Sequence, residues 1–220
     1  GLADAIIESG LQFRWNAAVR ADIFVRNQLS REQSILIAQK MKDSGCVAIN
    51  FSLESGNQEI IDLMNKKIKA ADFMDTVEVF RQVGIAVNTS VVFGYPVESA
   101  KTIKETFDMC YEARVYPSIG FLLPLPATGM YDYAKQHGYI TDEDAYLDSI
   151  TERQDICINL TTMTDSEILG EIRVGAERLN ELHDRLTALL APVRDRKMYV
   201  FHPAYGYFAD AYGLQQVAVE

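Results

Sequence analysis

The apolar residues in the first part of the chain follow two alternating patterns. Three continuous, largely β-branched runs are typical of buried strands; they lie at 46–53, 85–93 and 119–123. Segments in which apolar residues recur every three or four positions predict amphipathic helices; they lie at 30–45, 58–65, 73–83 and 99–112. A first strand is expected within 13–19. The pattern therefore predicts a series of strand-then-helix units.

Capping residues and glycines mark where the predicted helices begin and end. Ser30 and Gln33 form a capping box at the start of one helix. Gly45 and Gly84 each end a helix immediately before an apolar strand. This repeated join predicts a parallel sheet with right-handed crossovers. We therefore expect an α/β protein, built as a partial (βα) barrel or an open, mainly parallel sheet, with a long helix and a C-terminal strand-helix-strand element.

The last part of the chain predicts a different arrangement. Thr164 and Glu167 form a second capping box, and leucines at helical spacing follow as far as residue 192, which predicts one long helix. A strand is expected at 198–201, then a short aromatic helix, then a last strand at 217–219. The expected organisation has three parts, a barrel-like part at 1–164, a connecting helix at 165–192 and a terminal segment at 193–220.

Composition and charge narrow the classes of partner. With 220 residues and 48% hydrophobic content, the chain can bury a full core as one domain with an appendage. A net charge of −10 argues against binding to nucleic acid or an anionic membrane, because phosphate contacts need clustered Lys and Arg. No apolar run is long enough to span a membrane and no signal peptide is recognisable. The chain begins at Gly1 rather than Met, which indicates a trimmed or excised fragment.

The cysteines indicate a reducing compartment, and we expect a cytoplasmic protein. Cys46, Cys110 and Cys157 are an odd number at wide spacing, unlike a disulfide framework or a zinc site. Each is interpreted as a small, buried apolar residue.

Four turns are expected on the same edge of the predicted sheet, because each follows the carboxyl end of a parallel strand. Ligand sites of parallel α/β proteins lie at this edge. They are the turn near Arg20 and Asp22 and the turns at 54–56, 94–98 and 124–129. Each turn alone is explained by capping or chain reversal. Taken together they predict a binding site for a small-molecule ligand.

The order of three motifs resembles the later strands of the radical S-adenosylmethionine (radical SAM) barrel. The motifs are CVAINFSLESGNQEIIDLMNKK, VGIAVNTSVVFGYPVESAKTIKET and IGFLLPLPATGMYDYAKQHGYI, and the likeness covers about 13–164. It is greatest to the cobalamin-associated branch that includes anaerobic Mg-protoporphyrin ester cyclases. The resemblance implies a barrel that lacks its first two units, with a residual S-adenosylmethionine site.

The resemblance also implies roles for individual residues. Glu54 and Ser55 would meet the ribose or methionine end of the cofactor, and Arg20 and Lys66 would meet its carboxylate. The residues implied to shape the pocket and the turn beside it are Val92, Gly94, Pro96 and Glu98; those implied to lie near the adenine are Leu123 and Pro124. Two turns depart from the family pattern, because Val97 and Ala127 stand where glycine is usual. Since a residue with a side chain disfavours positive φ, we expect these two loops to differ from the family.

The cysteine motif of that family is absent from this sequence. Radical chemistry there needs three closely spaced thiolates on a [4Fe–4S] cluster, and the chain contains no C-x-x-x-C-x-x-C. The chain itself therefore does not support the cluster. We assign no catalytic residue and expect no autonomous catalysis.

The segment from about 182 to 220 resembles a second family, the zinc- and manganese-binding solute receptors of ABC transporters. The likeness centres on FHPAYGYF, in which the histidine position of that family falls on His202. Zinc needs several protein ligands, and His137 and His183 stand in no suitable spacing with it. We therefore expect His202 to be a hydrogen-bonded strand-end histidine and do not expect a zinc site. The aromatic residues that follow are interpreted as packing residues; they are Tyr205, Tyr207, Phe208 and Tyr212.

Three hypotheses follow from these two resemblances. In the first, the chain is a fragment or chimera built on a radical SAM barrel, which keeps a cofactor site without catalysing a reaction alone. In the second, it is the C-terminal part of an active radical SAM enzyme that acts on a tetrapyrrole-like or other organic substrate. In the third, it is a fragment of a zinc- or manganese-binding receptor that uses His202. An incomplete barrel exposes strand edges, so we expect the terminal strands or a second copy in a homodimer to cover them.

Overall fold

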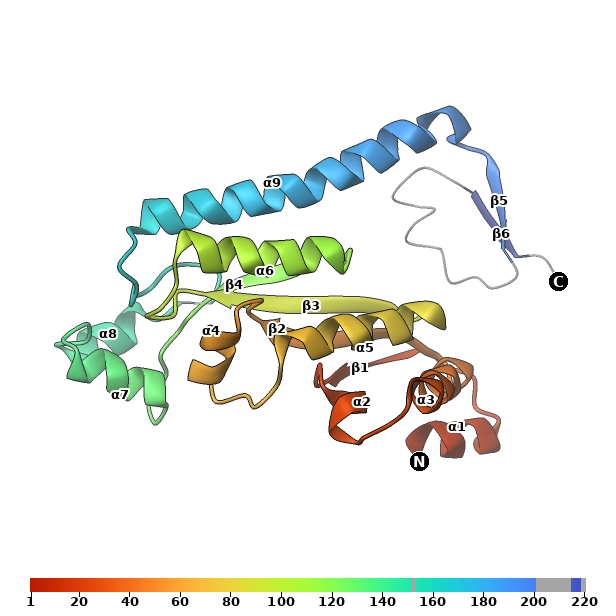
Figure 1. The fold of residues 1–220 in the computed structure, drawn as a ribbon, viewed down its shortest axis with the longest axis horizontal. Coiled ribbons are helices and arrows are strands. Elements are labelled where there is room, and N and C mark those ends of the chain that lie inside the picture. The colour runs from red at the N-terminus through yellow and green to blue at the C-terminus, as the bar shows by residue number, and fades with distance from the viewer. Residues whose placement is uncertain (152, 201–214, 219–220) are drawn as a thin grey trace. The chain divides into compact units, whose positions relative to one another are not determined.

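The computed structural model describes residues 1–151, 153–200 and 215–218, in two compact units at 1–175 and 176–220. The first unit contains a four-stranded parallel sheet in the order β1-β2-β3-β4 (Figure 1). Its strands are β1 (Trp15–Val19), β2 (Cys46–Glu54), β3 (Ala86–Phe93) and β4 (Pro117–Phe121). The expected α/β fold with an open parallel sheet is confirmed.

Helices connect the strands as the glycine and capping signals predict. Those between strands are α2 (Ile23–Arg26), α3 (Arg31–Asp43), α4 (Gln58–Leu63), α5 (Ala70–Gln82) and α6 (Ala100–Glu112). The others are α1 (Leu2–Ser9), α7 (Gly129–Gln136), α8 (Glu143–Ser149) and α9 (Asp165–Leu190), the last followed by a 3-10 turn (Ala191–Val193). The expected capping boxes are present, because Ser30 and Gln33 bond reciprocally at the start of α3, and the Glu167 backbone N–H donates to Thr164 Oγ1 over 3.3 Å at the start of α9.

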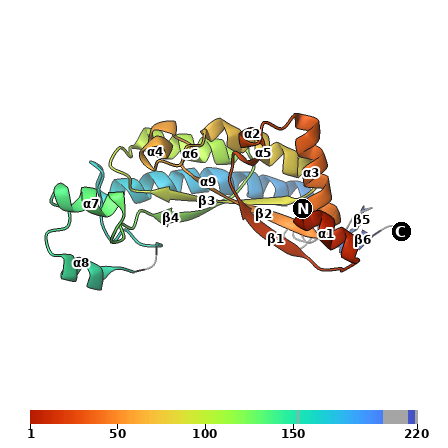
Figure 2. The ribbon, with the colours of Figure 1, turned by 90° about the horizontal axis from the view of Figure 1, so that it is seen from below.

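Aromatic side chains fill the space between the sheet and its helices. Phe51 on β2 meets Phe73 of α5 edge-to-face, with ring centroids 5.9 Å apart, and lies the same distance from Phe80. All three rings are fully buried, and each buried aromatic side chain contributes on the order of 2–3 kcal/mol to folding. Figure 2 shows helices α3 to α6 together on this one face of the sheet.

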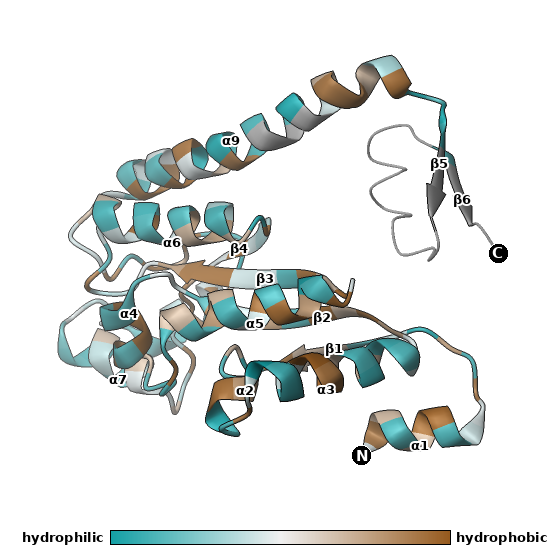
Figure 3. Ribbon diagram, turned by 45° about the vertical axis from the view of Figure 1, so that its right-hand side comes forward, coloured by the Kyte–Doolittle hydropathy of each residue, from teal (hydrophilic) through white to brown (hydrophobic). Residues whose placement is uncertain are grey.

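The opposite face of the sheet carries small and polar residues. Side chains alternate between the two faces of a strand, so residues between the buried positions of β2 and β3 point away from the helices. Among the described residues, several of these remain exposed, notably Ser52 and Asn88. Figure 3 shows the hydrophobic colour concentrated toward the arrowhead of β3, which delivers an apolar strand end to the carboxyl edge.

A second apolar cluster lies beyond β4, around α7 and α8. It joins seven buried residues, namely Val92, Leu122, Tyr131, Ala134, Ile140, Tyr146 and Leu160. The rings of Tyr131 and Tyr146 are 6.0 Å apart. This cluster fixes the segment that follows β4 against the carboxyl end of β3.

The last strand of the sheet begins and ends two residues earlier than predicted. The apolar run at 119–123 suggested its bounds, but β4 spans Pro117–Phe121. Leu122 still donates its backbone N–H to the Phe93 carbonyl over 2.8 Å, and Leu123 and Pro124 then leave the sheet. Pro117 is tolerated because it opens an edge strand, where a missing N–H costs no interior ladder bond.

The cysteine interpretation is right for two residues and wrong for the third. Cys46 and Cys110 are buried as expected, and burial raises the pKa of the Cys110 thiol to about 12. Cys157 is only partly buried, with its Sγ 3.0 Å from the Thr151 hydroxyl. Its segment lies in the connection between α8 and α9.

The second unit comprises the remainder of α9, the 3-10 turn and two short strands. β5 (Lys197–Val200) and β6 (Gln215–Ala218) pair with each other in parallel, with Lys197 opposite Gln215. They lie within two residues of the predicted strands. The expected aromatic helix and His202 lie outside the described residues. In the part of the chain described here, no helix is both long and apolar enough to cross a membrane.

Candidate functional site

The four turns that were predicted to share one edge do so, because the four strands run parallel. Each turn leaves the carboxyl end of its strand, where backbone groups no longer bond to a neighbouring strand. The side chains at this edge fall into two groups. One group forms a charged network near the ends of β1 and β2, and the other holds the turns against α6.

Arg20 anchors the charged network at the end of β1. Its Nε and Nη2 atoms each donate to the Asp22 carboxylate over 2.9 Å, a bidentate pair. The Asp22 carboxylate is buried and raises the pKa of the Arg20 guanidinium, chiefly through this hydrogen bond. Nη2 also donates to the Lys66 backbone carbonyl over 3.2 Å. Arg20 thus connects the first strand to the loop between α4 and α5.

Lys66 continues the network to the end of β2. Its Nζ lies 2.5 Å from Oε1 of Glu54, and both side chains are partly shielded, with exposed fractions of 31% and 16%. Glu54 has a φ of +67°, and the pairing of β2 with β3 shifts register between Ser52 and Glu54. A non-glycine residue in this conformation costs about 1 kcal/mol. The strained backbone thus holds the Glu54 carboxylate beside Lys66.

Ser55 faces the protein rather than the edge. Its hydroxyl lies 3.2 Å from Thr106 Oγ1 and accepts the Asn57 backbone N–H over 3.1 Å. Thr106 also accepts the Gly56 backbone N–H over 2.9 Å, and a Cβ on Gly56 would lie 2.7 Å from the Glu105 carbonyl oxygen. The turn at 54–56 is therefore fastened to α6 by Thr106.

Glu98 plays the equivalent part in the turn after β3. Its carboxylate is 2% exposed, accepts the Gly94 backbone N–H over 3.3 Å and accepts the Thr102 hydroxyl. Burial raises the pKa of Glu98 to about 7, although these two hydrogen bonds oppose the shift. Tyr95 beside it is half-buried, and burial, reinforced by the negative charge of Glu54, raises the pKa of its phenol to about 12.

The remaining predicted residues lie around this turn. Val92 and Pro124 are buried, and the Pro124 carbonyl accepts the Tyr146 hydroxyl over 2.7 Å. Pro96 and Leu123 are half-buried, and Gly94 has a φ of +106° with Leu122 Cβ 3.6 Å from the position of a Cβ. The structure therefore places all ten predicted residues at one edge. Contact of any of them with a ligand remains a prediction.

The expectation for the loop after β4 assumed that alanine in place of glycine would avoid a positive φ, and this assumption is wrong. Ala127 adopts a φ of +66° without being glycine. The turn is exposed, and Thr128 closes it by donating its hydroxyl to the Leu125 carbonyl over 2.7 Å. Because its methyl group points into open surroundings, alanine accepts the left-handed conformation at a cost of about 1 kcal/mol.

The two threonines of α6 are the site residues that sequence reasoning missed. Thr102 and Thr106 are both buried. Thr102 bonds to Glu98 in the turn after β3, and Thr106 bonds to the turn at 54–56. Their spacing of four places them on one face of the helix. Polar residues at helical spacing among apolar ones were the available signal, because a buried hydroxyl needs a partner.

The cysteines do not fit a [4Fe–4S] cluster. The Cys46 thiol lies at the start of β2 and the Cys110 thiol inside α6, and burial raises the pKa of both, which opposes formation of the thiolate that iron requires. Within the described residues, no three His, Cys, Asp or Glu side chains converge as metal ligands would. The charged network, by contrast, offers groups of both signs to a small zwitterionic molecule.

Comparison with known proteins finds matches to two different families, one in each part of the chain. Residues 23–110 match the radical SAM superfamily. Over 130 residues the chain is 25% identical to an uncharacterised methyltransferase of Pyrococcus horikoshii, a match that covers 59% of this chain and 26% of that protein. Over 138 residues it is 25% identical to bacteriochlorophyllide d C-12(1)-methyltransferase of Chlorobaculum tepidum, covering 62% of this chain and 28% of that protein. The radical SAM-like part thus spans about a quarter of these relatives.

The second match lies at the C-terminus. Residues 173–220 match the family of periplasmic zinc-uptake complex component A. Over 38 residues the chain is 60% identical to the high-affinity zinc uptake system protein ZnuA of Haemophilus influenzae, which is 17% of this chain and 11% of that protein. This similarity therefore rests on one short segment.

Two solved structures share part of the fold of this chain. The methyltransferase TsrM from Kitasatospora setae, with cobalamin and a [4Fe–4S] cluster bound, has a TM-score of 0.49 and 18% identity over 63% of this chain and 28% of that one. The cobalamin-dependent radical enzyme OxsB has a TM-score of 0.45 and 12% identity over 74% of this chain and 22% of that one.

Proposed function

We propose that the radical SAM-like part of this chain binds the methionine and ribose end of S-adenosylmethionine at the carboxyl edge of its sheet and does not catalyse a reaction alone. The observation that carries the proposal is the network of Arg20, Asp22, Lys66 and Glu54, which brings two cations and two carboxylates together at the ends of β1 and β2. The match of residues 23–110 to the radical SAM superfamily supports it.

The charges of this network are complementary to those of the cofactor. The methionine end of S-adenosylmethionine carries a carboxylate, which suits the ammonium of Lys66 and the guanidinium of Arg20. Its ribose hydroxyls are donors that suit the Glu54 carboxylate. In radical SAM enzymes this cofactor supplies one-electron chemistry together with a [4Fe–4S] cluster.

In this proposal, Ser55 and Glu98 support the binding site indirectly. Because their polar atoms bond to Thr106, Gly94 and Thr102, they position the backbone of the two turns. The site therefore depends on them without requiring that they touch the ligand.

The two family matches support a fragment or chimera as the origin of the chain. Residues 23–110 and 173–220 match unrelated families, and α9 runs from one part into the other without interruption. The second hypothesis, an active radical SAM enzyme of which this chain is a part, draws support from the relative that is named for a bacteriochlorophyllide substrate. A tetrapyrrole-like substrate belongs to that hypothesis, as does kinship with the ester cyclases.

Isothermal titration of the chain with S-adenosylmethionine tests the proposed site. We expect saturable binding heat from the unaltered chain and its loss in Glu54→Gln, because the amide no longer attracts Lys66 or accepts two hydroxyls equally. Glu59→Gln, an exposed glutamate on the neighbouring helix α4, is the matched control and should bind normally. An unaltered chain that gives no heat would disprove the proposal.

A second titration separates the two ends of the cofactor. Methylthioadenosine has the adenosine part but lacks the amino acid carboxylate. If Lys66 meets that carboxylate, Lys66→Ala should weaken S-adenosylmethionine by about tenfold and leave methylthioadenosine unchanged. Equal weakening of both ligands would show that Lys66 acts only by holding Glu54 in place.

A further inference from the structure

Glu98 is a buried carboxyl group with no cationic partner among the described residues. It is 2% exposed, and its two hydrogen-bond partners, the Gly94 backbone N–H and the Thr102 hydroxyl, are both neutral. An ionised carboxylate that is buried without a counter-charge is costly, so these surroundings favour the form that carries a proton. The same burial raises the pKa of Glu98 to about 7.

The charged and titratable groups of the neighbouring elements do not compensate for a charge on Glu98. Glu98, Glu54 of β2 and Arg153 of the segment after α8 all act electrostatically on the phenol of Tyr95, which belongs to the same turn. The lysines of α6, and Lys66, pair with other carboxylates; these pairs are Lys101–Glu105, Lys104–Asp108 and Lys66–Glu54. In the part of the chain that the structure describes, no ion pair reaches Glu98.

The hydrogen bonds of Thr102 show where the proton of Glu98 would lie. The Thr102 hydroxyl oxygen accepts the Ser99 backbone N–H over 2.9 Å, and two acceptors lie within its reach, the Ser99 carbonyl oxygen at 3.0 Å and Glu98 Oε1. A hydroxyl has one hydrogen to donate and two lone pairs that accept, so Thr102 donates to only one of these oxygens at a time. If Glu98 carries the proton, it donates to Thr102 and Thr102 donates to Ser99, which satisfies all three contacts at once.

Glu98 also closes the turn that follows β3. Its backbone N–H donates to the Tyr95 carbonyl over 2.8 Å, and its Oε2 accepts the Gly94 backbone N–H over 3.3 Å. Between these two bonds, Tyr95 and Pro96 are half-buried and Val97 is exposed. The turn therefore has solvent on its outer side and is held on its inner side by one carboxyl group.

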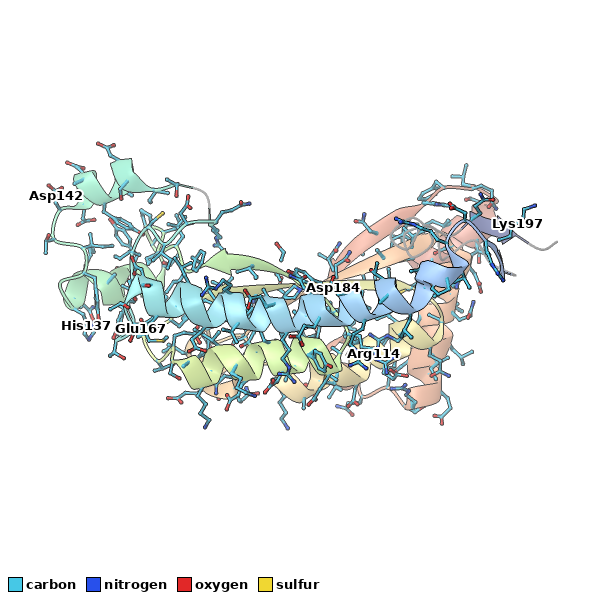
Figure 4. The ribbon with its side chains drawn as sticks, turned by 90° about the horizontal axis from the view of Figure 1, so that it is seen from above. Arg114, His137, Asp142, Glu167, Asp184 and Lys197 are labelled. Carbon is cyan, nitrogen blue, oxygen red and sulfur yellow. The ribbon has the colours of Figure 1, made fainter. Side chains whose placement is uncertain are left out.

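The fixed partner of this turn is α6. Its residues Ile103 and Phe107 are fully buried in the core, and Phe107 stacks on Phe93 at the end of β3. Figures 1 and 4 show α6 beside the first part of α9. A change at Glu98 would therefore move the turn rather than the helix.

We propose that Glu98 is a proton switch that controls the turn at 94–98. With its proton, Glu98 donates to Thr102 through Oε1 and accepts the Gly94 N–H through Oε2, and the turn lies closed against α6 as in the structure. When Glu98 releases the proton to water, the carboxylate has two neutral donors and no cation, so it moves toward solvent and the turn opens. The switch itself requires no ligand.

The switch has a consequence for the cofactor site, and this consequence rests on the proposed function. Gly94 belongs to the turn beside that site. If only the closed, protonated form binds, the affinity for S-adenosylmethionine in a calorimetric titration should weaken about tenfold between pH 6 and pH 8. Absence of binding heat at both pH values would disprove the cofactor site alone, because the test of the switch uses no ligand.

Amide hydrogen exchange of the free chain, followed by NMR, tests the switch. After correction for the intrinsic pH dependence of exchange, we expect the protection of the Gly94 N–H to fall by about tenfold or more between pH 5.5 and pH 8. At pH 8 its exchange should not respond to low concentrations of urea, as expected for a local opening. The N–H of Val77, in the middle of α5, should be better protected at pH 8 and should exchange faster as urea is added.

Matched variants decide whether Glu98 is responsible. Glu98→Gln keeps a donor for Thr102 and an acceptor for Gly94 but has no proton to lose in this range, so the fall in protection should be absent. Glu112→Gln, at the exposed C-terminal end of α6, should show the same fall as the unaltered chain. The proposal is overturned if Glu98→Gln also shows the fall, or if Gly94 follows Val77 in both protection and urea dependence.

Discussion

The ring of Phe107 lies directly against the backbone of Gly175. A Cβ added at Gly175 would lie 2.2 Å from Cδ2 of that ring and 2.4 Å from Cγ. Phe107 in turn stacks on Phe93, with ring centroids 5.6 Å apart and planes inclined by 18°. At Gly175, α9 therefore approaches α6 closely enough that only glycine fits.

This contact predicts opposite effects for two glycine substitutions in the same helix. Gly175→Ala should lower the free energy of unfolding by about 1–3 kcal/mol, because the methyl group must displace a packed ring. Gly170→Ala, where a Cβ would meet nothing within 4 Å, should raise it by about 0.5–1 kcal/mol through helix propensity. Denaturant unfolding followed by fluorescence of Trp15, the single tryptophan, measures both. Equal effects of the two substitutions would contradict the contact.

Glu98 predicts that the chain loses stability as the pH rises through neutrality. Because burial raises the pKa of Glu98 from about 4.5 to about 7 in the folded chain, the folded state retains a proton that the unfolded state releases in this interval. The stabilisation is complete below pH 4.5 and is lost as the pH rises to about 7.

Replacing the carboxyl group with an amide should remove this pH dependence. Glu98→Gln mimics the protonated form, and at pH 8 it should be more stable than the unaltered chain by on the order of 2–3 kcal/mol. The difference should shrink at pH 5.5. Glu112→Gln, at the exposed C-terminal end of the following helix α6, should show no such trend. A pH-independent difference for Glu98→Gln would mean that Glu98 is ionised throughout.

The hydrogen bonds of Thr106 predict that a small change in its side chain causes a large loss of stability. Thr106→Val keeps the volume but leaves the Gly56 N–H and the Ser55 hydroxyl without their shared partner, which should cost about 1–3 kcal/mol. Thr162→Val, at an exposed position, should change the free energy of unfolding by less than about 0.5 kcal/mol. If both variants unfold alike, the turn at 54–56 is not held by Thr106.

The C-terminal segment predicts no dependence of zinc binding on His202. One histidine cannot complete the four-coordinate shell that zinc prefers. Titration of the chain and of His202→Ala with zinc should therefore give the same curve. A weaker affinity in the variant would instead support the receptor-fragment hypothesis, and it would require the further ligands to be found.

Much of the architecture could be predicted from local signals alone. The glycines at 45 and 84 and the capping serines at 30 and 99 mark helix ends by backbone chemistry that depends on few neighbours. The shared edge of the four turns then follows from parallel pairing. The bounds of β4 were less predictable, because both Pro117 and Leu123 have neighbours that suit a strand, and only pairing with β3 decides between them.

The direction in which site residues point could not be predicted in the same way. Glu54 and Ser55 are adjacent in sequence, yet their side chains point in different directions. The Glu54 carboxylate contacts Lys66 at the edge of the sheet, whereas the Ser55 hydroxyl is buried against Thr106. The register shift and the positive φ at Glu54 cause this divergence. Both depend on tertiary pairing, which a sequence pattern of alternating residues does not contain.

The strained conformation of Glu54 has a consequence for any ligand that meets it. A flexible glutamate must lose rotamer and backbone freedom when it binds, and this loss weakens the affinity. At Glu54 the left-handed backbone and the Lys66 contact impose that order when the chain folds. The carboxylate is therefore preorganised, so its association with a ligand should carry a smaller entropic penalty than that of an exposed surface glutamate.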